Sequence, residues 1–477
     1  MVNLQPSNIL DLGTSSKHQN PIFIQRAGIW KICKAPAFAQ LNRNCHWPIL
    51  FPQMTKTIHR AKYLLQEPGI LLKNAVLHVS SSGRITSVDV WNHRRFVPKS
   101  QVVDWGSAIL IPGLINAHAH LELTSLGRKL SRFCSFSDWI VQLVKRRRTW
   151  TNEKYRASIN EGVRMSLASG TTLIGDIRSR PIVPDEDSSI PLRQVLFHEL
   201  IALAPAQAEN VLTNLQAQLN HLPTDPLIKH GLSPHSPYTV SPLLYRRAAQ
   251  LARIQKTVLA THVAETQAEL QFLRNGTGEF REFLSTMGSL PADWLPPRLA
   301  PIQYLDSLNV LGPNCLLIHC NYLDYASMIK ILKTRSHVVY CPRSHEFFGH
   351  ENHPIRQLLD LGINVALGTD SLASNTSLSM IDEMRFLYQK RKDITAEEIL
   401  KTATLNAAAA LGYRGTLGRL NRGYQADITI LEIPSYLSSR AIADEILEGA
   451  GECLATVIRG QIVWKKKDFH DIDAGFE

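Results

Sequence analysis

Short apolar runs alternate with amphipathic stretches through the middle of the chain. The runs lie at 109–115, 171–177, 194–201, 228–232, 258–262, 315–319, 337–341 and 364–368, with helical periodicity at 155–169, 242–254 and 355–361 among others. Eight strands alternating with helices over about 300 residues predict a (β/α)8 TIM-like barrel over 110–412. An open doubly wound sheet is the alternative, but it usually has fewer strands and a glycine-rich first turn, and no GxGxxG follows the first run. We expect the stretch 276–308 to be a helical excursion between the fifth and sixth strands.

Both ends of the chain are richer in β-like runs than the middle. Runs at 57–65, 69–79 and 84–90, and later at 426–431 and 455–464, predict strands, the last broken at Gly460. We therefore expect residues 54–109 and 413–477 to form one small composite β-sandwich domain. Residues 1–53 hold one acidic residue against five basic ones and show no apolar periodicity. They are interpreted as an N-terminal extension, disordered or transit-like, or, by preference, as an over-called start before Met54.

Composition and charge exclude several classes of protein. Of the 477 residues, 44% are apolar and 19% charged, which is ordinary for a globular protein and unlike a disordered chain. No apolar run of about 18 residues predicts a membrane span. The net charge of +11 is spread along the chain, so neither nucleic acid nor a membrane is an expected partner. Seven cysteines without a CxxC favour a reducing compartment, so we expect a cytoplasmic protein, with organelle targeting by residues 1–53 left open.

Ionisable residues follow several predicted barrel strands, at the end where barrel enzymes place their active sites. His118 and His120 end the first strand two residues apart, so both side chains can point to the same side. His262, His319 and Asp370 follow the fifth, sixth and eighth strands. Each of these residues could be structural by itself. Burying four imidazoles and a carboxylate together at one barrel mouth, however, would cost free energy unless they share a cation. Three histidines with one aspartate suit zinc or ferrous iron.

The ordered motifs PGLINAHAH (112–120), HVAET (262–266), a histidine after the sixth strand and GTDS (368–371) resemble the metal-dependent amidohydrolase superfamily. Within it, their order is similar to the branch of cytosine, guanine, S-adenosylhomocysteine and aminofutalosine deaminases and triazine chlorohydrolases. The resemblance covers about 57–465. It implies a distorted barrel, one catalytic metal ion and a small β-sandwich built from both chain ends, which agrees with the β-rich ends.

The resemblance also implies roles for single residues. One divalent metal ion, zinc or alternatively iron, would be bound by His118, His120, His262 and Asp370. Glu265 would be the general acid/base, His319 would polarise the attacking water or hold the substrate, and Asp370 would accept a proton from that water. His235, in the segment 233–241, would contact the substrate. The expected reaction is deamination of an amino-substituted heterocycle, purine- or pyrimidine-like, with release of ammonia.

Two departures from the family pattern concern the substrate. Adenosine-type members carry a glutamate just before a tryptophan, where this chain has Ser137, Asp138 and Trp139, so a nucleoside is in doubt unless Asp138 substitutes. After the seventh strand, His345 stands where related deaminases often have asparagine, and we count it among the substrate-binding candidates. His345, His350 and Arg343 form either a pocket for a polar substituent or a surface loop. The basic residues 146–148 either reach an anionic group of the substrate or, by preference, lie on a helix surface.

The leading interpretation is a hydrolase of carbon–nitrogen bonds other than peptide bonds, acting as a deaminase on a small molecule. Hydrolysis of a ring amide or a carbon–halogen bond at the same metal is the alternative, although Asp370 weighs against a chlorohydrolase. A binuclear site with a carboxylated lysine is disfavoured because Lys229 lies near the start of its strand. A scaffold protein that kept the barrel is the non-enzyme alternative, and the complete ligand set argues against it. Assembly into a homo-oligomer is left open.

Overall fold

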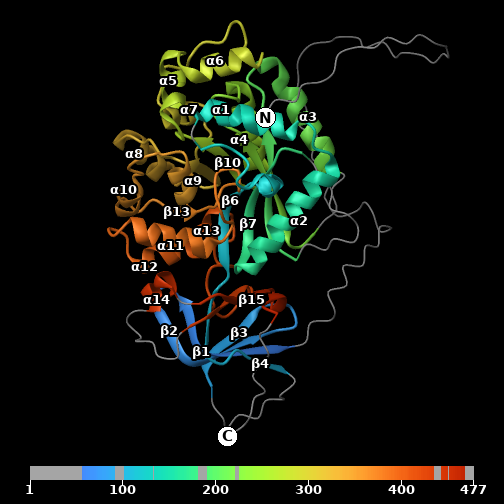
Figure 1. The fold of residues 1–477 in the computed structure, drawn as a ribbon, viewed down its shortest axis with the longest axis vertical. Coiled ribbons are helices and arrows are strands. Elements are labelled where there is room, and N and C mark those ends of the chain that lie inside the picture. Colours follow the sequence, from blue (N-terminus) through green and yellow to red (C-terminus); the bar gives the residue numbers. More distant parts are fainter. Residues whose placement is uncertain are drawn as a thin grey trace, which may run out of the picture. The chain divides into compact units, whose positions relative to one another are not determined.

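The structure is a computed structural model that describes residues 56–91, 101–132, 134–180, 191–220, 225–433, 442–449 and 451–467. The predicted extension 1–53 lies outside the described residues. Figure 1 shows a parallel barrel with its helices and a second sheet that combines strands from both ends of the sequence. No helix in the described ranges is both long and apolar enough to cross a membrane.

The barrel consists of eight parallel strands in the order β13-β12-β11-β10-β9-β8-β7-β6, as predicted. Its first and last strands meet at an isolated parallel bridge between Ala119 and Asp370. At this seam the amide N–H groups of Thr369 and Asp370 both donate to the carbonyl oxygen of His118, at 3.1 Å. The barrel therefore closes where two of the predicted metal ligands meet. The strands are β6 (Leu114–Ala119), β7 (Thr171–Arg178), β8 (Arg193–Leu200), β9 (Ile228–Pro234), β10 (Leu259–Val263), β11 (Cys315–His319), β12 (His337–Tyr340) and β13 (Val365–Leu367).

Amphipathic helices alternate with the barrel strands. In α4 (Pro242–Ile254), the Ser241 hydroxyl caps the first turn by accepting from the Leu244 N–H, and an apolar stripe that includes Tyr245 is buried. The stretch 276–308 holds α6 and α7 between β10 and β11, so the predicted helical excursion is confirmed. The other helices are η2 (Leu121–Leu126), α1 (Phe136–Arg147), α2 (Asn152–Ala168), η3 (Pro205–Gln207), α3 (Ala208–Leu219), α5 (Gln267–Asn275), α6 (Glu279–Thr286), α7 (Pro301–Ser307), α8 (Tyr325–Thr334), α9 (Pro342–Phe347), α10 (Ile355–Asp360), α11 (Met380–Lys390), α12 (Ala396–Thr402), α13 (Leu405–Ala410) and α14 (Ile442–Glu448).

The predicted first strand, 109–115, is wrong as a single element. Residues Ala108–Pro112 form β5 of the second sheet, and β6 of the barrel begins at Leu114. The chain passes between the two sheets at Gly113, where a Cβ atom would lie 2.3 Å from the Thr172 Oγ1 atom, so only glycine fits. Every residue of both strands is buried, and apolar periodicity therefore could not separate them.

The second sheet joins both ends of the described chain, as predicted for a composite β-domain. Its order is β16-β15-β14-β5-β1-β2-β3, with β4 paired to β1. The antiparallel pair β5 and β14 joins the N-terminal strands to the C-terminal ones. Leu64, Leu77, Ile428 and Val457 belong to one buried cluster, so strands from both ends share a core. The strands are β1 (Thr57–Glu67), β2 (Ile70–Val79), β3 (Ile85–Val90), β4 (Val102–Asp104), β5 (Ala108–Pro112), β14 (Ile428–Glu432), β15 (Cys453–Ile458) and β16 (Gln461–Lys465).

Candidate metal centre and active site

The five residues predicted at the barrel mouth come together in the structure. They are His118 in β6, His120 directly after it, His262 in β10, His319 at the end of β11, and Asp370 after β13. All five are buried. His319 and Asp370 adopt positive φ angles of 72° and 57°, so the backbone turns sharply just where the side chains enter the mouth.

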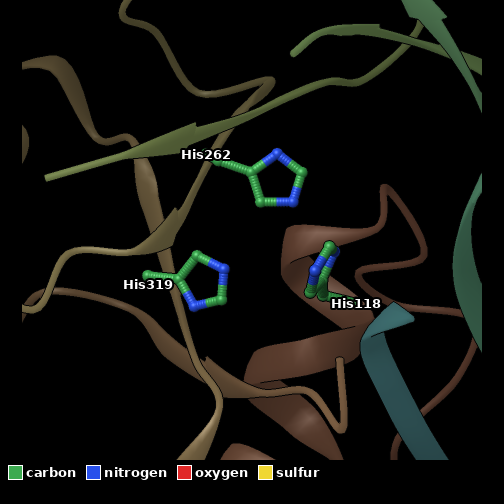
Figure 2. Close-up of side chains that lie close together, drawn as sticks. All are labelled: His118, His262 and His319. Atoms are coloured by element: carbon green, nitrogen blue, oxygen red, sulfur yellow. The ribbon is translucent and has the colours of Figure 1, made fainter. Parts of the chain in front are cut away.

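Two overlapping sets of side chains have the spacing of metal ligands. One ligand atom from each of His118, His262 and His319 lies within 4.8 Å of the others, and the same holds for His118, His120 and Asp370. Figure 2 shows the rings of the first set turned toward one another. The Oδ1 atom of Asp370 lies 3.6 Å from the His118 Nε2 atom and 3.8 Å from the His120 Nε2 atom. His118 belongs to both sets and is therefore the centre of these five residues, which we call the metal-type cluster.

The donor set fits a transition-metal ion such as zinc. Both ring nitrogens of His118 are buried without a hydrogen-bond partner among the described residues. The His262 Nδ1–H donates to the His235 carbonyl oxygen at 3.1 Å, which leaves the Nε2 lone pair of His262 free. Burial lowers the pKa of His262 to about 4 and also lowers the pKa values of His118 and His120, so the rings are neutral at pH 7. Neutral imidazole is the form that binds metal ions.

Asp370 is held by two serine hydroxyls. Ser344 and Ser374 each donate a hydrogen bond of 2.7 Å to its Oδ2 atom. Burial alone would raise the pKa of Asp370, but His118 and the neighbouring imidazoles outweigh burial and hold this pKa well below its usual range. The carboxylate is therefore ionised, and its Oδ1 atom faces the imidazoles.

Glu265 lies on the turn between β10 and α5. Its Oε1 atom is 3.4 Å from the His319 Nε2 atom, and the residue is 6% exposed. Burial, together with the carboxylates of Asp370 and Glu269, raises the pKa of Glu265 well above its usual value. A buried carboxyl group that holds its proton tightly beside a metal-type cluster is suited to acid–base chemistry.

His235 lies beside this cluster, with its ring centroid 5.1 Å from that of His262. Its Nδ1 atom is 2.7 Å from the Thr239 hydroxyl, which fixes the ring. A series of ring contacts continues outward: Tyr238 lies 5.8 Å from His235, and Phe280 of α6 stacks on Tyr238 at 4.1 Å. A series of ring contacts therefore links His262 to the start of α6, and the Tyr238 and Phe280 rings in it are buried.

His345 lies apart from the metal-type sets. It lines a cavity of about 550 Å³ together with His350 and His353, whereas Arg343 and the residues of the two metal-type sets are not among those that line this cavity. Its ring centroid is 5.4 Å from that of His350 and 5.8 Å from that of His353. The His353 Nε2–H donates to the His319 carbonyl oxygen at 2.9 Å, which connects this cavity to the active-site backbone.

The region where the family pattern has a glutamate contains a different carboxylate. Asp138 is exposed, whereas the Ser137 hydroxyl lies 3.5 Å from the Oε2 atom of Glu279, the first residue of α6. The expectation that residues 146–148 lie on a helix surface is wrong for Arg147. This residue is 6% exposed and donates to the Glu122 Oε1 atom at 2.7 Å.

Several residues around the site were not predicted from the sequence. Ser344 and Ser374 gave no signal, because a serine after a strand or in a loop has many ordinary uses. Glu269 did have a signal in the sequence, because it follows Thr266 at the spacing of a helix-capping motif. Glu279 lies 142 residues from Ser137, and no local pattern indicates that pairing.

A model of the amidohydrolase family matches residues 109–463. The 5-methylthioadenosine/S-adenosylhomocysteine deaminase of Pyrococcus furiosus is 28% identical over 382 residues, covering 77% of this chain and 86% of the relative. The 5'-deoxyadenosine deaminase of Methanothermobacter thermautotrophicus is 31% identical over 344 residues, covering 69% of this chain and 75% of the relative. A solved structure of an adenosine deaminase from Xanthomonas campestris with bound zinc has a TM-score of 0.72 at 22% identity, covers 87% of this chain and 94% of that chain, and supports the fold.

Proposed function

The chain belongs to the amidohydrolase family, and from this premise we propose that it is a metal-dependent deaminase of an amino-substituted heterocycle. The observation that carries the proposal is the approach of the Glu265 carboxyl group to within 3.4 Å of His319, beside the buried imidazoles and Asp370. Hydrolytic deamination requires both parts, a site that activates water and a group that transfers protons to the ring.

Zinc is the proposed metal ion, and iron is the alternative. The residues that would hold it are His118, His120, His262 and Asp370, whose neutral imidazoles and ionised carboxylate suit either ion. Such an ion, when bound, lowers the pKa of a water molecule toward ~7 and so supplies hydroxide at neutral pH.

Protons would be moved by residues of the chain itself. Asp370, held at Oδ2 by two serines, would take a proton from the attacking water at Oδ1 and pass it toward the departing ammonia. Glu265 would deliver a proton to the ring nitrogen next to the attacked carbon, so that negative charge does not build up there. His319, within reach of Glu265, would hold the attacking water or the new oxygen of the ring.

Adenosine derivatives are the proposed substrates, because both relatives are named for deaminating them. The resemblance alone left a nucleoside in doubt, since Ser137 replaces the expected glutamate. Glu279, whose carboxylate accepts from the Ser137 hydroxyl at 3.5 Å, would replace the missing glutamate as the acceptor for sugar hydroxyl groups. A ring-amide or carbon–halogen hydrolase remains the second candidate, and the buried, ionised Asp370 favours deamination.

The test is an ammonia-release screen across adenosine derivatives, free aminopurines, aminopyrimidines and pterins, with chloride release from a chlorotriazine as the competing assay. We expect ammonia from at least one adenosine derivative. Glu265→Gln should keep its metal ion and lose about 10²–10⁴-fold in kcat. Chloride release without ammonia release, or wild-type turnover by Glu265→Gln, would contradict the proposal.

A further inference from the structure

Two helices of the chain begin with the same local pattern, a threonine followed three residues later by a glutamate. At α12, Thr395 and Glu398 form a capping box, in which the Glu398 Oε2 atom accepts from the backbone N–H of Thr395 at 2.9 Å. At α5, Thr266 likewise accepts from the N–H of Glu269 at 3.1 Å. The carboxylate of Glu269, however, bonds to different residues.

The Glu269 carboxylate accepts two N–H groups that precede the helix cap. Its Oε1 atom accepts from Ala264 at 3.0 Å, and its Oε2 atom accepts from Glu265 at 2.9 Å. Ala264 has a φ of 51°, so these bonds hold a backbone turn that non-glycine residues rarely adopt. On the other side, the Asn321 amide donates to the Glu265 carbonyl oxygen at 3.0 Å. The backbone of Glu265 is thus fixed at both its N–H and its carbonyl group.

The burial of Glu269 argues against a role in helix capping alone. Glu269 is 1% exposed, whereas the Glu398 side chain, which caps α12, is 29% exposed. Burying a carboxylate is costly, and a partly exposed one caps a helix equally well. Burial also raises the pKa of Glu269 to about 7, which shows how unfavourable this environment is for its charge.

We propose that Glu269 is a positioning residue that fixes the backbone of Glu265, so that the Glu265 carboxyl group faces His319 and the metal centre. The inference rests on the acid–base role of Glu265 under the proposed function. Glu269 does not contact substrate in this account, and it acts through the turn that carries Glu265.

The variant Glu269→Gln tests the proposal, with Glu398→Gln as its matched control. Glutamine keeps one acceptor oxygen but places an NH₂ group against a backbone N–H. We expect kcat to fall about 10- to 100-fold, with KM within about threefold of the wild type and the metal content unchanged, because small displacements of reacting groups have such effects. Glu398→Gln should lower the melting temperature and leave kcat unchanged.

Two further variants separate positioning from general destabilisation. Glu269→Asp, whose shorter side chain cannot reach both N–H groups, should show the same selective loss of kcat. In the Glu265→Gln background, Glu269→Gln should cause no further loss, because the group that it positions is gone. Losses that multiply, a lowered metal content, or a lowered melting temperature with unchanged kcat would overturn the proposal. Wild-type turnover by Glu265→Gln alone would instead refute the proposed function.

Discussion

The two serines that hold Asp370 should set the affinity of the metal centre. Ser344 and Ser374 each donate to its Oδ2 atom at 2.7 Å, while Oδ1 faces His118 and His120. A hydrogen bond to a charged group contributes about 1.5–3 kcal/mol. Because about 1.4 kcal/mol corresponds to a tenfold change in affinity, Ser374→Ala should weaken metal binding at least about tenfold. The double variant with Ser344→Ala should approach the roughly 100-fold loss seen when outer contacts of metal ligands are removed.

A competition titration with a chelator of known zinc affinity measures this effect directly. Ser371→Ala is the matched control, because its hydroxyl accepts from the Ala373 N–H and lies next to Asp370 in the sequence. The control should bind zinc as the wild type does. If Ser374→Ala and the double variant both stay within about twofold of the wild type, the hydroxyls do not support the metal ligand and the reasoning fails.

Three other predictions concern stability and specificity. Asp427 accepts two buried hydrogen bonds from Arg193. In urea titrations, Asp427→Asn should therefore lower the free energy of unfolding by about 3–5 kcal/mol. Glu161→Gln, which removes an exposed ion pair with Arg164, should lower it by under about 1 kcal/mol. Burial lowers the pKa of His59 from 6.5 to about 4. Between about pH 4 and 6.5 the unfolded chain therefore binds a proton at His59 that the native chain does not. The free energy of unfolding of the metal-free protein should fall as the pH is lowered from 6.5 toward about 4, and it should fall less in His59→Gln. Equal slopes of this free energy against pH in the two proteins would contradict the prediction. Glu279→Gln should raise KM for adenosine derivatives about tenfold and leave KM for free bases unchanged. The control Glu282→Gln should change neither KM. An equal rise in KM for free bases in Glu279→Gln would exclude a role of Glu279 in sugar recognition.

Local rules predicted much of the site from the sequence. His118 and His120 are two residues apart at a strand end, and that spacing alone directs both side chains into the mouth. His262, His319 and Asp370 follow apolar strands, and a barrel brings the ends of its strands together. These residues were found because each depends on its own strand and on the closure of one sheet.

Contacts between distant segments were not predictable in this way. The change from β5 to β6 falls at Pro112-Gly113, a pair that can mark a turn, but the residues on both sides are apolar and were interpreted as one strand. The close approach of Thr172, on another strand, to Gly113 has no local signal in the sequence. Arg147 lies in a basic run typical of a surface, yet Glu122 neutralises it in a buried position. The hydroxyl contacts of Asp370 and the Ser137–Glu279 pair likewise depend on how separate loops pack, which periodicity and motifs do not encode.

The central claim is that one divalent ion, held by the imidazoles and Asp370, is required for deamination. The most direct test measures the metal content of the purified chain by mass spectrometry, together with ammonia release before and after chelation and after return of zinc. The account predicts about one equivalent of zinc or iron per chain, loss of turnover on its removal and recovery on its return. Full turnover by protein that holds less than about a tenth of an equivalent of any metal would contradict it.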